Sequence, residues 1–130
     1  MHAEHADRAT LNELSKIIIG CAFIVLNALG AGFQEKVDEN ALVHEARKTG
    51  LVVAQQFGAT VTYDGSVVGA YFVDLLVEDA VLVELKAVKA TIEVHRVQCG
   101  NYLKATDLRL RLLLNFGNRR LEIKRVVNRL

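Results

Sequence analysis

Apolar residues recur along this chain with two different periods, and the changes of period divide it into elements. Helical spacing of apolar residues predicts three helices, over residues 10–28, 34–48 and 92–105. Short apolar, β-branched runs predict five strands, over residues 51–63, 67–77, 81–86, 110–116 and 121–127. Because several of these strands are apolar on both faces, we expect a mixed sheet with helices packed on each side. The predicted class is α/β, in the order ααβββαββ.

Capping and turn residues set the expected boundaries of these elements. Thr10-Leu11-Asn12-Glu13 matches a capping box, so the first helix is expected to begin near Thr10, after a loose segment over residues 1–9. Gly50 is expected to end the second helix, and Asp64-Gly65 predicts a two-residue turn between strands. The acidic residues of the second helix are expected mostly on a solvated face, and they are Glu35, Asp38, Glu39 and Glu45.

The stretch 70–88 is predicted to form a hairpin whose apolar strands are interrupted by charge. Asp74, Glu84 and Lys86 lie inside the two apolar runs. A buried strand carries charge only where the charge is paired or binds something. These three residues are therefore the main functional indication in the residue pattern.

Whether the charges meet depends on the length of the hairpin turn, because side chains alternate along a strand. A two-residue turn would pair Val73 with Glu84 and put Asp74 on the other face. A three-residue turn would pair Val77 with Val81, and it would place Asp74 opposite Glu84. We favour the three-residue turn, because it leaves a clean apolar opposite face made of Val73, Leu75, Val77, Val81, Val83 and Leu85.

Two facing carboxylates repel each other, and they are tolerated if a divalent cation lies between them or if Lys86 neutralises them. Hard oxygen ligands suit Mg²⁺ or Mn²⁺, and Lys86 beside such a metal could orient a water or stabilise negative charge. A partly exposed salt-bridge cluster at a strand end is the alternative explanation of the same three residues. The short pattern by itself leaves both open.

The composition of the chain narrows the kinds of protein that it can be. The chain has 130 residues, of which 52% are hydrophobic and 24% charged, with no proline, which indicates one folded domain. Cys21 and Cys99 form no metal or disulfide motif, which favours a reduced, cytoplasmic protein without zinc. The apolar run 17–33 contains Asn27 and three glycines and falls short of the ~20 residues of a membrane span, so we expect a buried helix.

Basic residues gather near the C-terminal end, where residues 104–130 hold 8 Lys/Arg against 2 Asp/Glu. Such a surface could follow a phosphate backbone or could be a solvated edge. The candidate residues are Arg109, Arg111, Arg119, Arg120, Lys124, Arg125 and Arg129.

Several blocks of the chain resemble a known family. They include Gly32-Phe33-Gln34-Glu35, Tyr71-Phe72-Val73-Asp74, Glu84-Leu85-Lys86 and Leu114-Asn115-Phe116-Gly117. Over about residues 10–130 the chain is similar to the small bacterial GxxExxY family, within the PD-(D/E)XK nuclease superfamily. The resemblance implies a restriction-endonuclease-like core and a metal-dependent nuclease.

The resemblance also implies roles for individual residues. Asp74 and Glu84 would bind Mg²⁺ or Mn²⁺, Glu35 would join the metal shell, and Lys86 would act near the attacking water. Gln98 and Tyr102 match a Q-x-x-x-Y motif and would contact the substrate from one helix face. His95 matches a frequent family histidine, with a helix surface position as its alternative.

Two positions depart from the family pattern. Asp38 stands where the family has the final tyrosine of GxxExxY, and Gly100 lies within the third predicted helix, where a larger residue is expected. The expected function is a nuclease acting on nucleic acid, with DNA favoured over RNA. The alternative is a non-catalytic nuclease-fold module that binds nucleic acid or a protein, and self-association into a homodimer is a further expectation.

Overall fold

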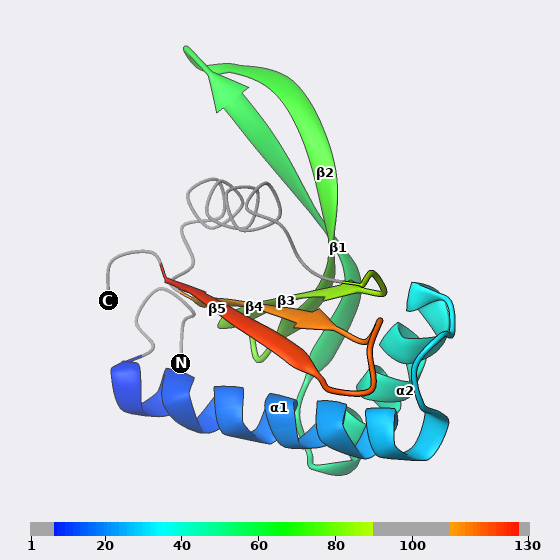
Figure 1. The fold of residues 1–130 in the computed structure, drawn as a ribbon. Helices are drawn as coiled ribbons and strands as arrows, with labels where there is room; N and C mark the ends of the chain where they lie inside the picture. Colours follow the sequence, from blue (N-terminus) through cyan, green and yellow to red (C-terminus); the bar gives the residue numbers. More distant parts are fainter. Residues whose placement is uncertain (1–6, 90–109, 128–130) are drawn as a thin grey trace.

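The computed structural model describes residues 7–89 and 110–127, which form two helices and a five-stranded sheet (Figure 1). The elements are α1 (Arg8–Leu29), α2 (Glu35–Lys48), β1 (Val53–Tyr63), β2 (Ser66–Val77), β3 (Val81–Lys86), β4 (Leu110–Asn115) and β5 (Glu122–Val127). Every predicted element among the described residues is confirmed. The third predicted helix, over residues 92–105, lies outside them.

The sheet is mixed, and its strand order follows the chain as β1-β2-β3-β4-β5. β3 and β4 run parallel, with Val83 beside Leu112, and the other neighbouring pairs are antiparallel. β4 is buried along its whole length and lies between β3 and β5. This agrees with the predicted α/β class and with strands that are apolar on both faces.

Both described helices cover the same face of the sheet, with α1 lying beneath the strands and α2 at one end (Figure 1). α1 buries a stripe of residues three or four apart, which begins at Leu11 and ends at Leu26. This stripe packs with β2, β3 and β4 in one core that includes Val83 and Leu112. Helices on both faces were expected, and among the described residues the helices cover one face.

The first helix begins earlier than its sequence pattern suggested. Asp7, and not Thr10, is the N-cap, because its side chain accepts a hydrogen bond from Thr10 N at 2.7 Å. An aspartate three residues before that amide satisfies an orphan N–H as well as a threonine would, and it starts the helix at Arg8. α1 is long and apolar enough to span a membrane, with mean hydropathy 1.6, but its stripe packs on the sheet.

The distal halves of β1 and β2, residues 57–73, form an arm that extends away from the sheet (Figure 1). Asp64 and Gly65 both have positive φ and make the predicted two-residue turn at its tip. The arm carries exposed apolar side chains and one charged residue, Asp64. The exposed side chains are Val61, Tyr63, Val67, Val68 and Phe72.

A small second core lies where the arm joins the sheet. Val73, Leu76 and Leu82 form it, with Phe57 and Tyr71 packed against them. The sequence pattern had assigned Val73 to the other face, with Leu75 and Val77, and that assignment was wrong. Val73 pairs with Phe57 of β1, which follows Gln56, a residue whose φ of 52° departs from the extended geometry of a strand.

Candidate active site

The turn between β2 and β3 has the register that brings the charged residues together. Glu78 and Asp79 adopt φ of 52° and 51°, and Ala80 N donates to Val77 O at 2.9 Å. Val77 therefore pairs with Val81, and the ladder continues to Leu75 and Val83. The three-residue register is confirmed, and its next position places Asp74 opposite Glu84.

Asp74 and Glu84 interact at this position. Asp74 Oδ2 accepts a hydrogen bond from Leu85 N at 2.8 Å, so the carboxylate is held against β3. Burial is the main cause that raises the pKa of Glu84 to about 7; the Arg111 charge opposes this rise, and the nearby Asp74 carboxylate contributes to it. The site therefore holds two acids, and the Asp74 carboxylate lies close enough to Glu84 to raise its pKa.

Arg111 is the buried partner of Glu84. It is fully buried on β4, next to Leu82 of β3, and its Nη2 forms an ion pair with Glu84 Oε2. The hypothesis that Arg111 follows a phosphate backbone on the surface was wrong. A basic residue inside an apolar strand, Leu110-Arg111-Leu112, is the signal that could have indicated a buried partner.

Glu35 lies beside the end of β3. It is the first residue of α2, where an acid favours the helix dipole, and its Oε1 accepts from Ala87 N at 3.2 Å. α2 thus places the Glu35 carboxylate against the backbone of Ala87, the residue that follows Lys86. Within residues 7–89 and 110–127, however, no three Asp, Glu, His or Cys side chains lie close enough to hold one metal ion. The three-acid metal shell remains a prediction.

Two acids of α2 are buried, and the expectation of a solvated acidic face was wrong for them. Asp38 is 1% exposed and Glu39 is 4% exposed, because this side of α2 faces β1. Burial, with a smaller contribution from the charge of Glu35, raises the pKa of Asp38 to about 6. Asp38 Oδ1 has no hydrogen-bond partner among the described residues.

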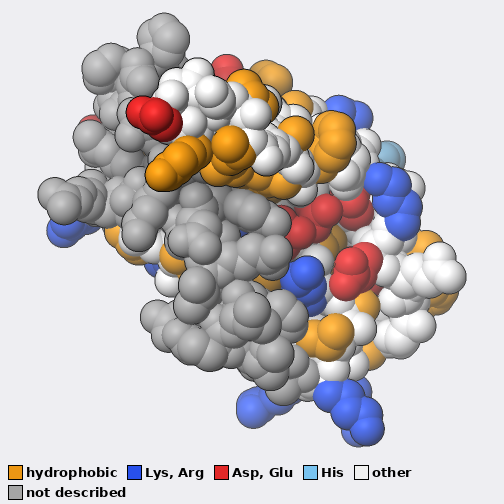
Figure 2. All heavy atoms as spheres, turned by 90° about the horizontal axis from the view of Figure 1, so that it is seen from above, with side chains coloured by type: hydrophobic (Ala, Val, Ile, Leu, Met, Phe, Trp, Pro, Cys, Tyr) orange, Lys and Arg blue, Asp and Glu red, His pale blue; other side chains and the backbone are white. Residues whose placement is uncertain are grey.

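We refer to five linked acids as the acidic cluster, namely Glu35, Asp38, Glu39, Asp74 and Glu84. Glu35 is exposed, Asp74 and Glu84 are half-buried, and the other two are buried. Figure 2 shows acidic side chains next to basic ones on the upper surface of the molecule. The cluster thus extends from the surface into the protein.

Asn115 and Gly117 hold the end of β3 that carries Lys86. Phe116 N donates to Lys86 O at 2.8 Å, and Asn115 Oδ1 accepts from Val88 N at 3.1 Å and Gly117 N at 2.9 Å. A Cβ on Gly117 would overlap the Val88 backbone. The sequence analysis assigned no functional role to Asn115 or Gly117, although both belong to Leu114-Asn115-Phe116-Gly117, one of the blocks that resemble the family.

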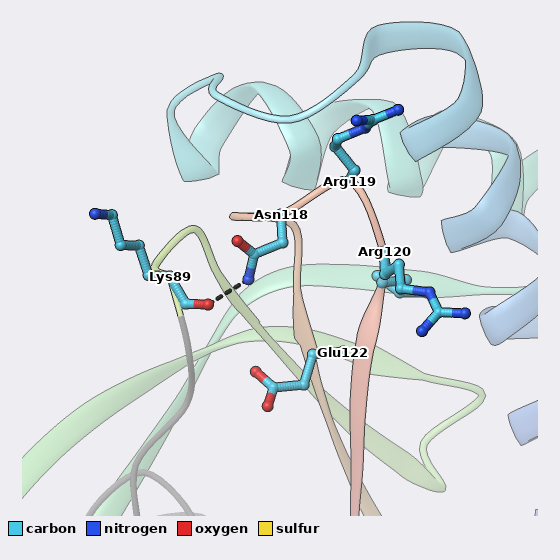
Figure 3. Close-up of a pocket in the computed structure, with 6 residues that line it drawn as sticks. Lys89, Asn118, Arg119, Arg120 and Glu122 are labelled. Atoms are coloured by element: carbon cyan, nitrogen blue, oxygen red, sulfur yellow. Dashed lines mark hydrogen bonds between the residues drawn. The ribbon is translucent and has the colours of Figure 1, made fainter.

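An open pocket of about 920 Å³ lies at the same end of the sheet, lined by Lys89, Asn118, Arg119, Arg120, Leu121 and Glu122 (Figure 3). Asn118 Nδ2 donates to Lys89 O across it. The side chains of Arg119 and Arg120 point away from each other and not to one point (Figure 3). Both are exposed, as a phosphate-tracking role or a solvated edge would require.

Several predicted residues fall outside the described residues. They are His95, Gln98, Cys99, Gly100, Tyr102, Arg109 and Arg129. Their expected roles therefore stay predictions. Cys21 is free and lies on the buried face of α1, where burial raises the pKa of its thiol.

Comparison with known proteins places this geometry in a family. The model of the PD-(D/E)XK nuclease superfamily matches residues 12–126. The crystal structure of SSO0001 is similar in fold, with a TM-score of 0.54 and 12% identity, over 73% of this chain and 50% of that one. The chain thus spans half the length of that structure, and no curated protein matches its sequence. The fold, the facing acids of β2 and β3 and the family match agree, and the chain belongs to the PD-(D/E)XK nuclease superfamily.

Proposed function

We propose that the protein is a divalent-metal-dependent nuclease that hydrolyses phosphodiester bonds in nucleic acid. The observation that carries this proposal is the register of β2 and β3, which brings Asp74 and Glu84 to facing positions. Lys86 lies on the same face of β3 as Glu84, two residues further along. A nuclease of this superfamily requires such a set of two acids and a lysine.

The donor set fits Mg²⁺ or Mn²⁺. Both ions prefer oxygen ligands, and Mg²⁺ commonly uses one or two carboxylates and keeps several waters. The raised pKa of Glu84 indicates that this carboxyl group resists ionisation when no cation is present. A bound cation would supply positive charge to the scissile phosphate.

The residues around this pair have proposed roles of their own. Lys86 would stabilise developing negative charge or orient the attacking water. Asn115 would position Lys86 through the hydrogen bonds that hold the backbone at the end of β3. Glu35 would add a ligand from the N-terminus of α2. Gln98 and Tyr102 would contact the substrate, for which we propose DNA rather than RNA.

The bacterial GxxExxY family is the finer assignment that we propose. Gly32-Phe33-Gln34-Glu35 supports it, and Asp38 departs from it at the position of the tyrosine. Asp38 is buried, so this change adds a carboxyl group inside the protein where the family pattern has a phenol. The acidic cluster is thereby more negative than the family pattern alone would make it.

One observation favours a second candidate function, a nuclease-fold module that binds nucleic acid or a protein without cleaving. The Glu84 carboxylate is already paired with the buried Arg111. In such a module the ion pair would replace the metal as the partner of Glu84. The exposed apolar arm would then supply a surface for a partner, including a second copy of the chain.

A cleavage assay separates the two candidates. Purified protein with Mn²⁺ or Mg²⁺ should cleave DNA or RNA, and Asp74→Ala should reduce the rate at least ~1000-fold, the scale of a lost electrostatic group. Asp79→Asn is the matched control, because Asp79 is an exposed turn acid and should leave the rate unchanged. Cleavage that persists in Asp74→Ala would contradict the proposed site.

Calorimetric titration with Mn²⁺ provides the second measurement. Millimolar or tighter binding that is lost in Asp74→Ala supports the nuclease. The absence of binding, together with the absence of cleavage, supports the non-catalytic module. Light scattering on the same samples tests the proposed homodimer.

A further inference from the structure

Glu39 is a buried acid that the proposed chemistry does not use. It is 4% exposed in the middle of α2, and both its oxygens are occupied. Its Oε2 accepts from Lys36 Nζ at 3.0 Å and from Gln55 Nε2 at 2.8 Å, and its Oε1 accepts from Gln56 Nε2 at 3.0 Å. Glu39 is therefore the point where α2 is joined to two consecutive residues of β1.

Two consecutive residues of a regular strand cannot both reach Glu39, because their side chains point to opposite faces. Gln56 solves this geometrically, since its φ of 52° lies in the left-handed region. It falls between the ladder pairs Gln55–Leu75 and Phe57–Val73, which places it opposite Asp74. Such a conformation is uncommon for glutamine and persists only where the surroundings hold it.

The same amide group also lies next to the proposed metal ligand. Gln56 Nε2 is 3.4 Å from Asp74 Oδ1, whereas Asp74 Oδ2 accepts from Leu85 N at 2.8 Å. The contact of Gln56 with Asp74 is long and weak, and its contact with Glu39 is the stronger one. The orientation of the Gln56 amide is therefore set mainly by Glu39. Because Glu39 can only accept, the amide presents its NH₂ end to both acids.

We propose that Glu39 is a positioning residue that acts through Gln56 to orient the Asp74 carboxylate. It touches neither substrate nor metal. Its carboxylate selects the amide orientation of Gln56, and Gln56 with Leu85 N then holds the two oxygens of Asp74. This inference rests on the proposed function, in which Asp74 is a metal ligand.

Gln55 is a matched control that the chain itself provides. It makes the same kind of contact with Glu39, at 2.8 Å, and a second one with Asn40 at 3.0 Å. Among the described residues it makes no hydrogen bond to Asp74, and it pairs with Leu75 on the ladder. Gln55→Met and Gln56→Met thus remove the same group from Glu39, and only the second removes it from Asp74.

The test combines calorimetric Mn²⁺ titration with NMR of the metal-free protein. Gln56→Met and Glu39→Gln should each weaken Mn²⁺ affinity about 10-fold, the scale for an outer-shell partner. The double variant should be no weaker than either single one, because both act along one path. The Mn²⁺ affinity of Gln55→Met should stay within about 2-fold of that of the unchanged protein. Its loss of stability should be comparable to that of Gln56→Met.

The NMR measurement keeps this inference separate from the proposed function. The ¹³C resonance of the Asp74 carboxyl group should shift in Gln56→Met and Glu39→Gln and not in Gln55→Met, with no metal present. Equal effects of Gln55→Met and Gln56→Met would overturn the positioning role and leave a purely structural one. If the unchanged protein binds no Mn²⁺, the proposed function fails, and the resonance still decides whether Glu39 orients Asp74.

Discussion

The arm and the acidic cluster meet on one strand, β2, and they distribute apolar and charged side chains in opposite ways. Beyond Val73 the arm exposes Val67, Val68 and Phe72 to 61–66% each. On the other side of Val73, carboxylates and the Arg111 guanidinium are buried or half-buried around Asp74. Exposed apolar groups and buried charges both lower the stability of a domain. The contrast agrees with the two proposed functions, in which the acidic cluster binds a charged ligand and the arm binds an apolar partner.

The largest expected effect comes from the buried charge of the cluster. Arg111→Met should lower the free energy of unfolding at pH 8.5 by about 4 kcal/mol, because the half-buried Glu84 carboxylate loses its ion-pair partner. Urea denaturation measures the change. Arg119→Met, at an exposed turn, should change it by less than about 0.5 kcal/mol. A loss below about 1 kcal/mol for Arg111→Met would mean that water reaches Glu84.

Glycine-to-alanine substitutions compare how tightly the backbone is packed near the acidic cluster and in the arm. Gly117→Ala should destabilise the protein by about 3 kcal/mol, because a Cβ there overlaps the Val88 backbone and displaces the segment after Lys86. Gly69→Ala, in the arm, has open space and should change the stability by at most about 0.5 kcal/mol. The midpoint of thermal unfolding reports both. Equal effects would show that β3 does not need the close approach of Gly117.

The pH dependence of stability measures the cost of the buried Asp38 charge. The pKa of Asp38 is about 6 in the folded protein against 3.8 as the ordinary value, so the folded state binds the proton more tightly. The protein therefore loses stability as pH rises from 4 to 6, and the loss persists above pH 6. Asp38→Asn should be more stable than the unchanged protein by roughly 2 kcal/mol at pH 7 and equal to it near pH 3.

Urea denaturation at pH 3, 5 and 7 measures this difference for Asp38→Asn. Asp64→Asn is the control, because Asp64 is exposed at the tip of the arm, and its effect should not vary in this way. An Asp38→Asn variant that is less stable at pH 7 would reveal a partner that stabilises the Asp38 charge.

The smallest effects distinguish the arm from the core within β2. Val73→Thr should cost about 1.5 kcal/mol, because it buries a hydroxyl at a position that is 0% exposed. Val67→Thr, at 65% exposure, should change the stability by less than about 0.5 kcal/mol. If Val67→Thr instead lowers the unfolding midpoint in a concentration-dependent way, the arm is buried in a homodimer.

Much of the fold was predictable because it depends on local patterns. The apolar run Val81-Leu82-Val83 and the turn chemistry of Asp64-Gly65 are determined within a few residues. The register of β2 and β3 was predicted by weighing which turn length leaves an apolar face. The start of α1 was missed because Asp7 and Thr10 are both good caps, and only the helix packing decides between them.

The sequence by itself determined the element order, the hairpin that carries Asp74, Glu84 and Lys86, and the family resemblance, because periodicity and short motifs are properties of neighbouring residues. Only the tertiary structure decided what surrounds those residues. It turned Arg111 inward to Glu84, buried Asp38 and Glu39, and joined Gln56 to Asp74. These contacts join residues 16 to 27 positions apart, or different elements, so no local pattern records them. Burial of a charge depends on the whole fold.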